Sequence, residues 1–490
     1  MSFSDLIDRR ARFNPDDAAV ADASQSLSNA DLLHRIRVAA AHLEDLGIGA
    51  DDVVALKLTN RAEFVVLLFA TWRLGATVTP VNPALTATEV ERQLADSGAK
   101  LLVVEDGAST ESAVRTLEVG QLRREGRVRF ELPVIDSSSI ALLIYTSGTT
   151  GVPKGVMLDH ANLDAMTTMG CDALDVGPED RCLLILPLFH VNGIVVSVLM
   201  SLLVGASLVI ADRFNPETFF DVIEKERPTF FSAVPTIYGM LAALPEQVQP
   251  DTSSVRFAVC GAAPASAELL ERFEERFGFP IVEAYGLSEG TCGSATNPVH
   301  GLRKAGTVGL PFPGQEIRIV GPGGETMPQG ETGEVIVRGP NVMRGYLGRP
   351  EETAAVIVDG WLHTGDLGRL DEDGYLTIVG RSKEMIIRGG ENIYPKEIED
   401  VLAADPNVLE VAVIGVPDEK WGEIVVAYVQ PRPGSTIDND SLAALCKSQL
   451  SGYKRPTAIH VLEALPKSAV GKLDKRALLR TALVSQVAEA

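Results

Sequence analysis

The sequence YTSGTTGVPKG at residues 145–155 provides the starting point for interpreting the chain. It follows the apolar run IALLI at 140–144, which predicts a buried strand. Its eleven residues include four serines or threonines, three glycines and one lysine. Glycine lets the backbone approach a ligand closely, and consecutive exposed N–H groups form a site for anions. Because the hydroxyls and Lys154 add further donors, the stretch suits a polyphosphate.

This stretch differs from the common phosphate-binding loop. That loop has the form G-x-x-x-x-G-K-[ST], and a helix follows it directly. Here Val152 and Pro153 separate the glycine from the lysine, and Gly155 follows the lysine. A flexible surface turn would also explain the composition, so the assignment depends on motifs further along the chain.

The bulk composition indicates a globular protein of more than one domain. The chain has 490 residues, more than a single core usually supports, and 46% of them are hydrophobic. Its formal net charge of −22 argues against binding to nucleic acid or to anionic membranes. A polyanion such as ATP therefore needs local positive sites.

Cysteine usage and hydropathy predict a cytoplasmic protein without integral membrane association. The five cysteines form no C-x-x-C pair and suggest reduced core residues, and the first ten residues lack the apolar core of a signal peptide. The run 194–210 carries no charge, but Gly205 interrupts it. We therefore expect a buried helix, a turn and a strand there, rather than a membrane span.

Strand and helix patterns alternate through most of the chain, which predicts parallel sheets covered by helices. Beyond residue 308, short strands between Pro/Gly turns indicate a β-rich subdomain, and a compact α+β segment follows residue 380. We expect largely helical structure at 1–50, strands at 53–58, 76–81 and 100–104, and helices at 63–74 and 89–96.

Further motifs follow in order. GAAP at 261–264 comes after a strand-like run, and EAYGLSE at 283–289 places an aromatic before a glycine. Tyr285 can stack on a flat base, and the Glu289 carboxylate suits Mg²⁺, which uses few protein carboxylates. WLHTGD at 361–366, GRSK at 380–383, GGENIYP at 389–395 and LPKSAVGK at 465–472 complete the series. Alone, each also fits an ordinary turn or a solvated surface.

Together these motifs resemble those of the adenylate-forming superfamily, which includes acyl-CoA synthetases, peptide-synthetase adenylation domains and luciferases. The resemblance extends over about residues 5–480. It implies an α/β fold with a large N-terminal domain (1–380) of two α/β lobes plus a β-barrel-like subdomain. It also implies a hinge at 381–383, with Lys383 as the hinge residue, and a small mobile α+β C-terminal domain (384–490).

The resemblance also implies an ATP site. Asp366 would hold the ribose hydroxyls, and Glu289 would hold Mg²⁺ together with Thr146. Ser288 stands where the family usually has threonine, and keeps the hydroxyl. The implied ATP-binding residues are Thr146, Ser147, Gly148, Thr149, Thr150, Gly151, Lys154, Gly261, Ala262, Ala263, Glu283, Ala284, Tyr285, Gly286, Ser288, Asp366, Arg381 and Lys472.

Lys472 is the implied catalytic lysine, alongside Glu289 and His190. An anionic carboxylate must attack an anionic triphosphate, and a positioned ammonium offsets that repulsion; losing such a partner typically costs roughly 3–4 kcal/mol. Lys467 and Lys475 lie nearby and are alternatives.

The second substrate is implied to be coenzyme A. In the CoA-forming branch, the matching glycines Gly389 and Gly390 border the pantetheine tunnel, and Trp421 matches a position near CoA. The alternative for Trp421 is a partly exposed aromatic in a turn.

The acid pocket is implied to include His190, Val191, Asn192, Val234, Gly286, Gly290 and Gly293. A histidine at such a position is otherwise a satisfied core residue. No lysine or arginine stands at these positions, whereas a second substrate carboxylate would require one. We therefore expect a monocarboxylic fatty, arylalkanoic or arylpropenoic acid.

The predicted activity is an AMP-forming acid:CoA ligase that works through an acyl-adenylate. One alternative is an adenylating enzyme that transfers its product to a carrier-protein thiol, and another is an inactive nucleotide-binding protein. The complete set of motifs argues against an inactive protein. The pair Gly389 and Gly390, together with the lack of a carrier domain, favours CoA over a carrier-protein thiol as the acceptor. A homodimer is left open.

Overall fold

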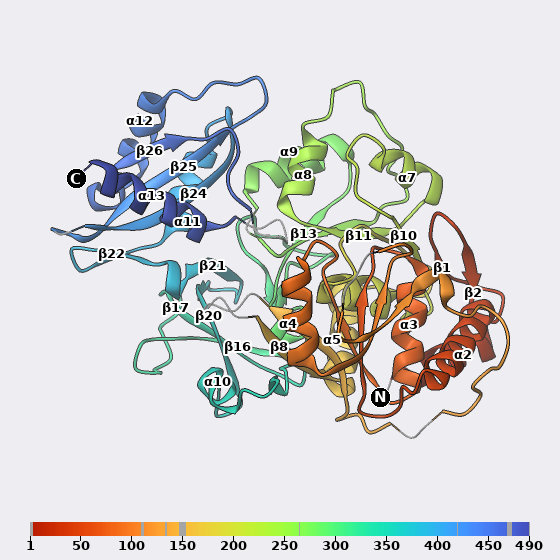
Figure 1. The fold of residues 1–490 in the computed structure, drawn as a ribbon. Helices are drawn as coiled ribbons and strands as arrows, with labels where there is room; N and C mark the ends of the chain where they lie inside the picture. Colours follow the sequence, from red (N-terminus) through yellow and green to blue (C-terminus); the bar gives the residue numbers. More distant parts are fainter. Residues whose placement is uncertain are drawn as a thin grey trace. The chain divides into compact units, whose positions relative to one another are not determined.

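The computed structural model describes residues 3–108, 112–132, 135–146, 153–263, 265–418, 420–467 and 473–489 (Figure 1). It confirms the predicted α/β class. The chain divides into two compact units. The first holds Met1–Ala265, Leu269–Ile317 and Ile336–His363, and the second holds Ser266–Glu268, Arg318–Val335 and Thr364–Ala490.

The first sheet of the large unit combines a parallel centre with antiparallel edges. Its order, in the described part of the chain, is β15-β14-β13-β12-β11-β9-β10-β1-β2. Strands β9 to β13 and β1 run parallel, as expected for strands that alternate with helices. The bounds are β1 Ala18–Ala21, β2 Ser26–Ser28, β9 Arg181–Leu184, β10 Ser207–Ile210, β11 Phe230–Ala233, β12 Phe257–Cys260, β13 Ile281–Tyr285, β14 Ala295–Thr296 and β15 Leu310–Pro311.

The second sheet of this unit contains the predicted strands near residues 53, 76 and 100. Its order is β18-β8-β7-β4-β3-β5-β6. Strands β7 and β8 form an antiparallel pair, in which Thr146 lies opposite Lys154. The bounds are β3 Val53–Lys57, β4 Thr77–Pro80, β5 Ala99–Val104, β6 Arg115–Glu118, β7 Ile140–Thr146, β8 Lys154–Asp159 and β18 Gly345–Tyr346.

Two smaller sheets follow. In one, the order is β16-β17-β20-β19 with β21 beside β20; in the other, it is β23-β22-β25-β24 with β26 beside β25. The bounds are β16 Glu316–Val320, β17 Gly333–Arg338, β19 Ile357–Val358, β20 Trp361–Leu370, β21 Leu376–Arg381, β22 Ile386–Arg388, β23 Glu391–Ile393, β24 Val408–Asp418, β25 Gly422–Pro431 and β26 Ala458–Val461.

Several helices in the large unit begin with a capping box between the residue before the helix and its third residue. Ser28 and Asp31 form a capping box at α2, and Thr86 and Glu89 form one at α4. The bounds are α1 Leu6–Phe13, α2 Asn29–Asp45, α3 Ala62–Arg73, α4 Ala87–Ser97, α5 His160–Leu174, α6 Met200–Val204, α7 Phe219–Glu226, α8 Pro235–Ala242, α9 Ala267–Phe277, α10 Pro350–Val356, α11 Pro395–Ala403, α12 Asn439–Gln449 and α13 Lys475–Glu489.

The expectation for residues 1–50 was partly wrong. Between α1 and α2 the chain forms β1 and β2, and β1 pairs with β10, nearly two hundred residues away in sequence. Such short strands owe their structure to this distant pairing rather than to a local pattern.

The apolar run at 194–210 folds as predicted. It forms the π-helix η3 Gly193–Leu199, then α6, a turn at Gly205 with φ of 95° and strand β10. Within the described residues, no helix is long and apolar enough to cross a membrane. All five cysteines are free, in agreement with the prediction of reduced residues.

Candidate active site

Four predicted segments of the site lie at the carboxyl ends of the parallel strands of the first sheet. Strands β9, β11, β12 and β13 are parallel, so their carboxyl ends share one edge of the sheet. The loop with His190 follows β9, whereas Val234, Gly261 and Gly286 directly follow β11, β12 and β13. Ligands of open α/β sheets bind outside the carboxyl ends of the strands. The topology therefore gathers residues that are about 100 positions apart in sequence.

The turn after β12 lies close to the end of β13. The Gly261 N–H donates to the Ala233 carbonyl at 3.2 Å. A Cβ atom at Gly261 would lie 3.3 Å from the Ala284 carbonyl oxygen, which is a tight approach. Ala262 follows with φ of 68°, in the left-handed region that most residues avoid. The turn at 261–263 is therefore tight, and Ala262 and Ala263 are exposed beyond the end of β12.

The turn after β13 is strained and tightly packed. A Cβ at Gly286 would lie 1.7 Å from the Cys292 carbonyl oxygen, so only glycine fits. Thr291 and Cys292 have φ of 55° and 109°. The Thr291 hydroxyl donates to the Asn341 carbonyl at 2.5 Å and fixes the turn. Strain of this kind persists where surrounding contacts hold it, and often marks functional sites.

Glu289 lies on the 3-10 helix η4 Ser288–Gly290, directly before the strained residues. Its Oε1 accepts the hydroxyl of Tyr346 at 2.9 Å, and its carbonyl accepts the Met343 N–H at 2.8 Å. In the described part of the chain, no three metal-ligating side chains gather at one point. A single carboxylate still fits Mg²⁺, which commonly takes its other ligands from phosphates and water.

Lys154 is the first residue of β8 and lies opposite Thr146 in the β7–β8 pair. Its ammonium forms an ion pair with Glu352 and lies 4.8 Å from the centroid of the Tyr346 ring. Hydrogen bonding to Lys154 lowers the pKa of Glu352, which keeps that carboxyl ionised. Ser147, Gly148, Thr149, Thr150 and Gly151 lie outside the described residues, as does Lys472.

Three of the predicted acid-pocket residues, His190, Val191 and Asn192, directly precede the π-helix η3. The Phe189 and His190 rings are 4.5 Å apart, and the Asn192 side chain lies beside the thiol of Cys292. Burial raises the pKa of Cys292 to about 12, so this wall carries a neutral thiol. A Cβ at Gly293 would lie 2.4 Å from the Phe312 ring. The structure thus brings 190–192 to the turn at 286–293.

Sequence reasoning missed several neighbours of these residues. Asn60 accepts the Leu188 N–H at 2.9 Å and donates to the Leu186 carbonyl at 3.1 Å, which fixes the loop before His190. Tyr346 contacts both Glu289 and Lys154. No local motif marks either residue, because each acts through strands far away in sequence.

In the second unit, Asp366 and Arg381 lie opposite each other in the β20–β21 pair. Arg381 Nε is 2.9 Å from Oδ1 of Asp366, which is 4% exposed. Thr364 Oγ1 accepts the Asp366 N–H at 3.0 Å and so holds this strand in position. Lys383 follows on the short 3-10 helix η5 Ser382–Glu384. Asp366 and Arg381, the residues predicted to bind ribose and phosphate, are therefore immediate neighbours.

Gly389 and Gly390 form the turn of the β22–β23 hairpin. The GGENIYP pattern at 389–395 predicts a strand-to-helix turn, and this prediction is wrong, because β23 lies between the glycines and α11. Their φ values of 61° and 90° suit a two-residue hairpin turn. The Gly389 N–H donates to the Trp421 carbonyl at 2.7 Å, and a Cβ at Gly389 would lie 3.0 Å from the Trp421 ring.

Trp421 is a 43% exposed aromatic surrounded by cations. The Arg388 guanidinium lies 5.6 Å and the Lys420 ammonium 5.1 Å from its ring. Arg388 also donates to the Tyr453 carbonyl at 2.8 Å. In a chain of net charge −22, such a local group of cations around an exposed ring suits a nucleotide with phosphates.

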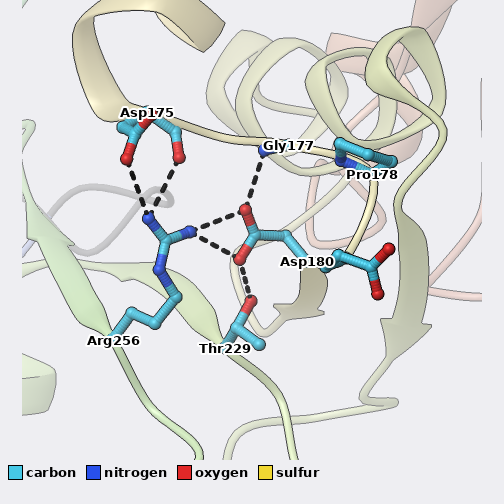
Figure 2. Close-up of a pocket in the computed structure, with 7 residues that line it drawn as sticks. Asp175, Gly177, Pro178, Asp180, Thr229 and Arg256 are labelled. Atoms are coloured by element: carbon cyan, nitrogen blue, oxygen red, sulfur yellow. Dashed lines mark hydrogen bonds and ion pairs between the residues drawn. The ribbon is translucent and has the colours of Figure 1, made fainter.

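A separate hollow of about 410 Å³ lies at the opposite edge of the first sheet (Figure 2). Asp180, Thr229 and Arg256 line it, and they directly precede β9, β11 and β12. Figure 2 shows the Arg256 guanidinium bridging Asp180, at 2.7 Å, and Asp175, at 3.3 Å. This network ties together the amino ends of the strands, and we interpret it as structural.

Comparison with known proteins identifies the family. The chain matches the AMP-binding enzyme family over residues 7–347 and the AMP-binding enzyme C-terminal domain over residues 397–472. The chain belongs to the AMP-binding enzyme family. It lies in the acyl-CoA synthetase branch of the adenylate-forming superfamily, as the motifs predicted.

Relatives and solved structures match nearly the whole chain. A feruloyl-CoA synthase from Amycolatopsis sp. is 40% identical, with 95% of this chain and 96% of the relative covered. An oxalate–CoA ligase from Arabidopsis thaliana is 38% identical, with 97% of each covered. The o-succinylbenzoate CoA synthetase from Bacillus subtilis is 33% identical. Its structure with the acyl-adenylate intermediate gives a TM-score of 0.90 (97% of each chain), and its structure with ATP and magnesium gives 0.88 (97% and 99%).

Proposed function

We propose that the protein is an ATP-dependent carboxylic acid:CoA ligase that acts through an acyl-adenylate. The observation that carries this proposal is the convergence of His190, Val234, Gly261 and Gly286 at one sheet edge, in a member of the AMP-binding enzyme family. Its substrates are a small carboxylic acid, ATP and CoA.

In the first step, a carboxylate oxygen of the acid attacks the α-phosphorus of ATP. The bond between that phosphorus and the bridging oxygen to the β-phosphate breaks, and pyrophosphate leaves. Lys154 and the loop at 146–151 hold the β- and γ-phosphates, while Lys472 stabilises the charge that develops on the bridging oxygens. Magnesium, held by Glu289 and Thr146, neutralises phosphate charge when bound.

The remaining motifs are assigned to the nucleoside. The turns at 261–263 and 283–286 flank the adenine, with Tyr285 as the stacking residue, and Ser288 supplies a hydroxyl. Asp366 binds the ribose hydroxyls, and Arg381 binds ribose or phosphate. The ion pair between Asp366 and Arg381 supports this proposal, because it holds both side chains in one place.

In the second step, the CoA sulfur attacks the acyl carbon, and AMP leaves with the electrons of the broken acyl–oxygen bond. We propose that residues 384–490 form a mobile domain that turns about Lys383 between the steps, withdrawing Lys472 and presenting Gly389 and Gly390 to the pantetheine. Trp421 with Arg388 and Lys420 offers an aromatic and cationic surface to the CoA nucleotide.

The acid is proposed to be monocarboxylic, with a fatty, arylalkanoic or arylpropenoic tail. The walls contain no lysine or arginine and are assigned to His190, Val191, Asn192, Val234, Gly286, Gly290 and Gly293. The 40% identity to a feruloyl-CoA synthase supports the arylpropenoic choice. A cytoplasmic location and a homodimer stay predictions; light scattering of the purified chain checks the second.

Pyrophosphate release over a panel of acids, with and without CoA, tests the proposal. We expect release with arylpropenoic or fatty acids, and thioester and AMP only when CoA is present. Oxalate and malonate are the matched dicarboxylates, and preference for either would contradict the acid assignment. Release without any CoA thioester would favour a carrier-protein acceptor, and no release with any acid would favour an inactive nucleotide-binding protein.

A further inference from the structure

Tyr346 lies between two residues of the proposed ATP site. Its hydroxyl donates to Glu289 Oε1 at 2.9 Å, and its ring centroid lies 4.8 Å from Nζ of Lys154. The residue is 7% exposed. One buried phenol thus contacts both the carboxylate assigned to magnesium and the ammonium assigned to the phosphates.

Strand register explains the contact with Lys154. Strand β18 pairs antiparallel with β8, and Tyr346 lies opposite Val156. Lys154 is two residues before Val156, so its side chain projects from the same face of the sheet. Diagonal neighbours of this kind are within reach of aromatic and long side chains. The first residue of β8 therefore places its ammonium over the ring.

Backbone contacts fix Tyr346 relative to Glu289. The Tyr346 N–H donates to Oγ1 of Thr353 at 2.9 Å, and the Met343 N–H donates to the Glu289 carbonyl at 2.8 Å. The segment before Tyr346 is therefore joined to Glu289 by a main-chain bond as well as by the phenol. The hydroxyl therefore meets Oε1 in a fixed geometry.

We propose that Tyr346 is a positioning residue of the ATP site: its hydroxyl orients Glu289 for magnesium, and its ring positions the ammonium of Lys154 for the phosphates. This inference rests on the proposed function. Partners that hydrogen-bond a metal-binding side chain fix its orientation, and their loss typically lowers metal affinity about 10- to 100-fold. A cation over a ring gains a smaller electrostatic attraction.

Equilibrium binding of ATP, measured by calorimetry with EDTA and again with saturating Mg²⁺, tests this role without turnover. Tyr346→Phe keeps the ring and removes the hydroxyl. We expect unchanged metal-free binding and an Mg²⁺-dependent gain in ATP affinity that is about tenfold smaller than in the wild type. Tyr346→Leu also removes the ring, so metal-free binding should weaken about two- to fivefold as well.

Tyr238→Phe is the matched control. Tyr238 is 0% exposed, and its hydroxyl donates to the Val259 carbonyl at 2.8 Å. This variant loses a buried hydroxyl in the same unit, but should keep the wild-type Mg²⁺ gain. An unchanged gain in Tyr346→Phe, or an equal loss of metal-free and Mg²⁺-dependent binding, would overturn the proposal.

A double variant tests whether the Tyr346 hydroxyl acts through Glu289. Because the hydroxyl acts through Glu289, adding Tyr346→Phe to Glu289→Gln should not change the Mg²⁺ gain further. A further, additive loss would overturn the role. If the wild-type chain binds no ATP, the proposed function is wrong. If it binds Mg·ATP but the Tyr346 variants keep the wild-type Mg²⁺ gain, only the assignment of Tyr346 is wrong.

Discussion

Lys154 is ion-paired with Glu352 across the interface between β8 and α10, within the large unit. Glu352 also lies 3.3 Å from Arg349, which in turn lies 3.6 Å from Asp96. The lysine assigned to the phosphates of ATP therefore has a carboxylate partner within the protein. Phosphate oxygens must compete with that carboxylate.

Removing the competing charge should tighten ATP binding. Glu352→Gln keeps the shape of the side chain and releases Lys154. Since a partly exposed ion pair is weak, we expect the KM or Kd for ATP to fall about two- to fivefold. The control is Glu351→Gln, which makes the same change in net charge on an exposed neighbour of the same helix. If both variants bind ATP equally more tightly, the gain comes only from the change in net charge. If Glu352→Gln binds ATP more weakly, Glu352 instead holds Lys154 in the position that binds phosphate.

Residue patterns predicted those parts of the site that depend on local chemistry. The strand before residue 145, the turns after β12 and β13 and the neighbouring pair Asp366 and Arg381 all follow short motifs. Tyr346 was missed because its partners, Glu289 and Lys154, become visible only through the register of a two-residue strand. Strands β1 and β2 were missed for a similar reason, since they are stabilised by pairing with a strand nearly two hundred residues away.

Lys472→Ala should separate the two steps of the reaction. Loss of a preorganised cation lowers the rate of adenylate formation about 10²- to 10³-fold. Thioester formation from supplied acyl-adenylate should be unchanged, because the proposed rotation withdraws Lys472 in that step. Rapid-quench measurement of each half-reaction checks this. Lys467→Ala is the control, since Lys467 lies 3.0 Å from Glu410. If adenylate formation is lost in Lys467→Ala and kept in Lys472→Ala, Lys467 is the catalytic lysine. If Lys472→Ala slows both steps equally, the proposed separation of the two steps is wrong.

Gly390→Leu should impair the second step selectively. A side chain there would enter the proposed path of pantetheine, and a misplacement of about 1 Å can cost about 10²-fold in rate. The measurement is CoA thioester formation from supplied acyl-adenylate, compared with pyrophosphate release in the first turnover.

Gly434→Leu controls for backbone strain in this experiment. Gly390 and Gly434 have φ of 90° and 77°, and a Cβ at either meets no atom within 4 Å. Both variants therefore impose a similar conformational cost, but only position 390 lies in the predicted tunnel. Normal CoA turnover in Gly390→Leu would remove the tunnel assignment.

His160 should make the stability of the protein fall at mildly acidic pH. The side chain is 1% exposed at the start of α5, its ring is 5.4 Å from that of Trp72, and burial lowers its pKa to about 4. An unfolded histidine has a pKa of about 6.5. Above that pH both states are neutral; as the pH falls from 6.5 towards 4, only the unfolded state takes up the proton, so stability is lost, by up to about 3 kcal/mol. Because carboxylates also titrate in this range, the test is the difference between the wild type and His160→Phe in unfolding temperature from pH 7 to pH 4.5. Between pH 7 and pH 4.5, the unfolding temperature of His160→Phe should fall less than that of the wild type. His34→Gln, which changes an exposed histidine, should follow the wild type. An equal fall in all three proteins would show that His160 does not contribute.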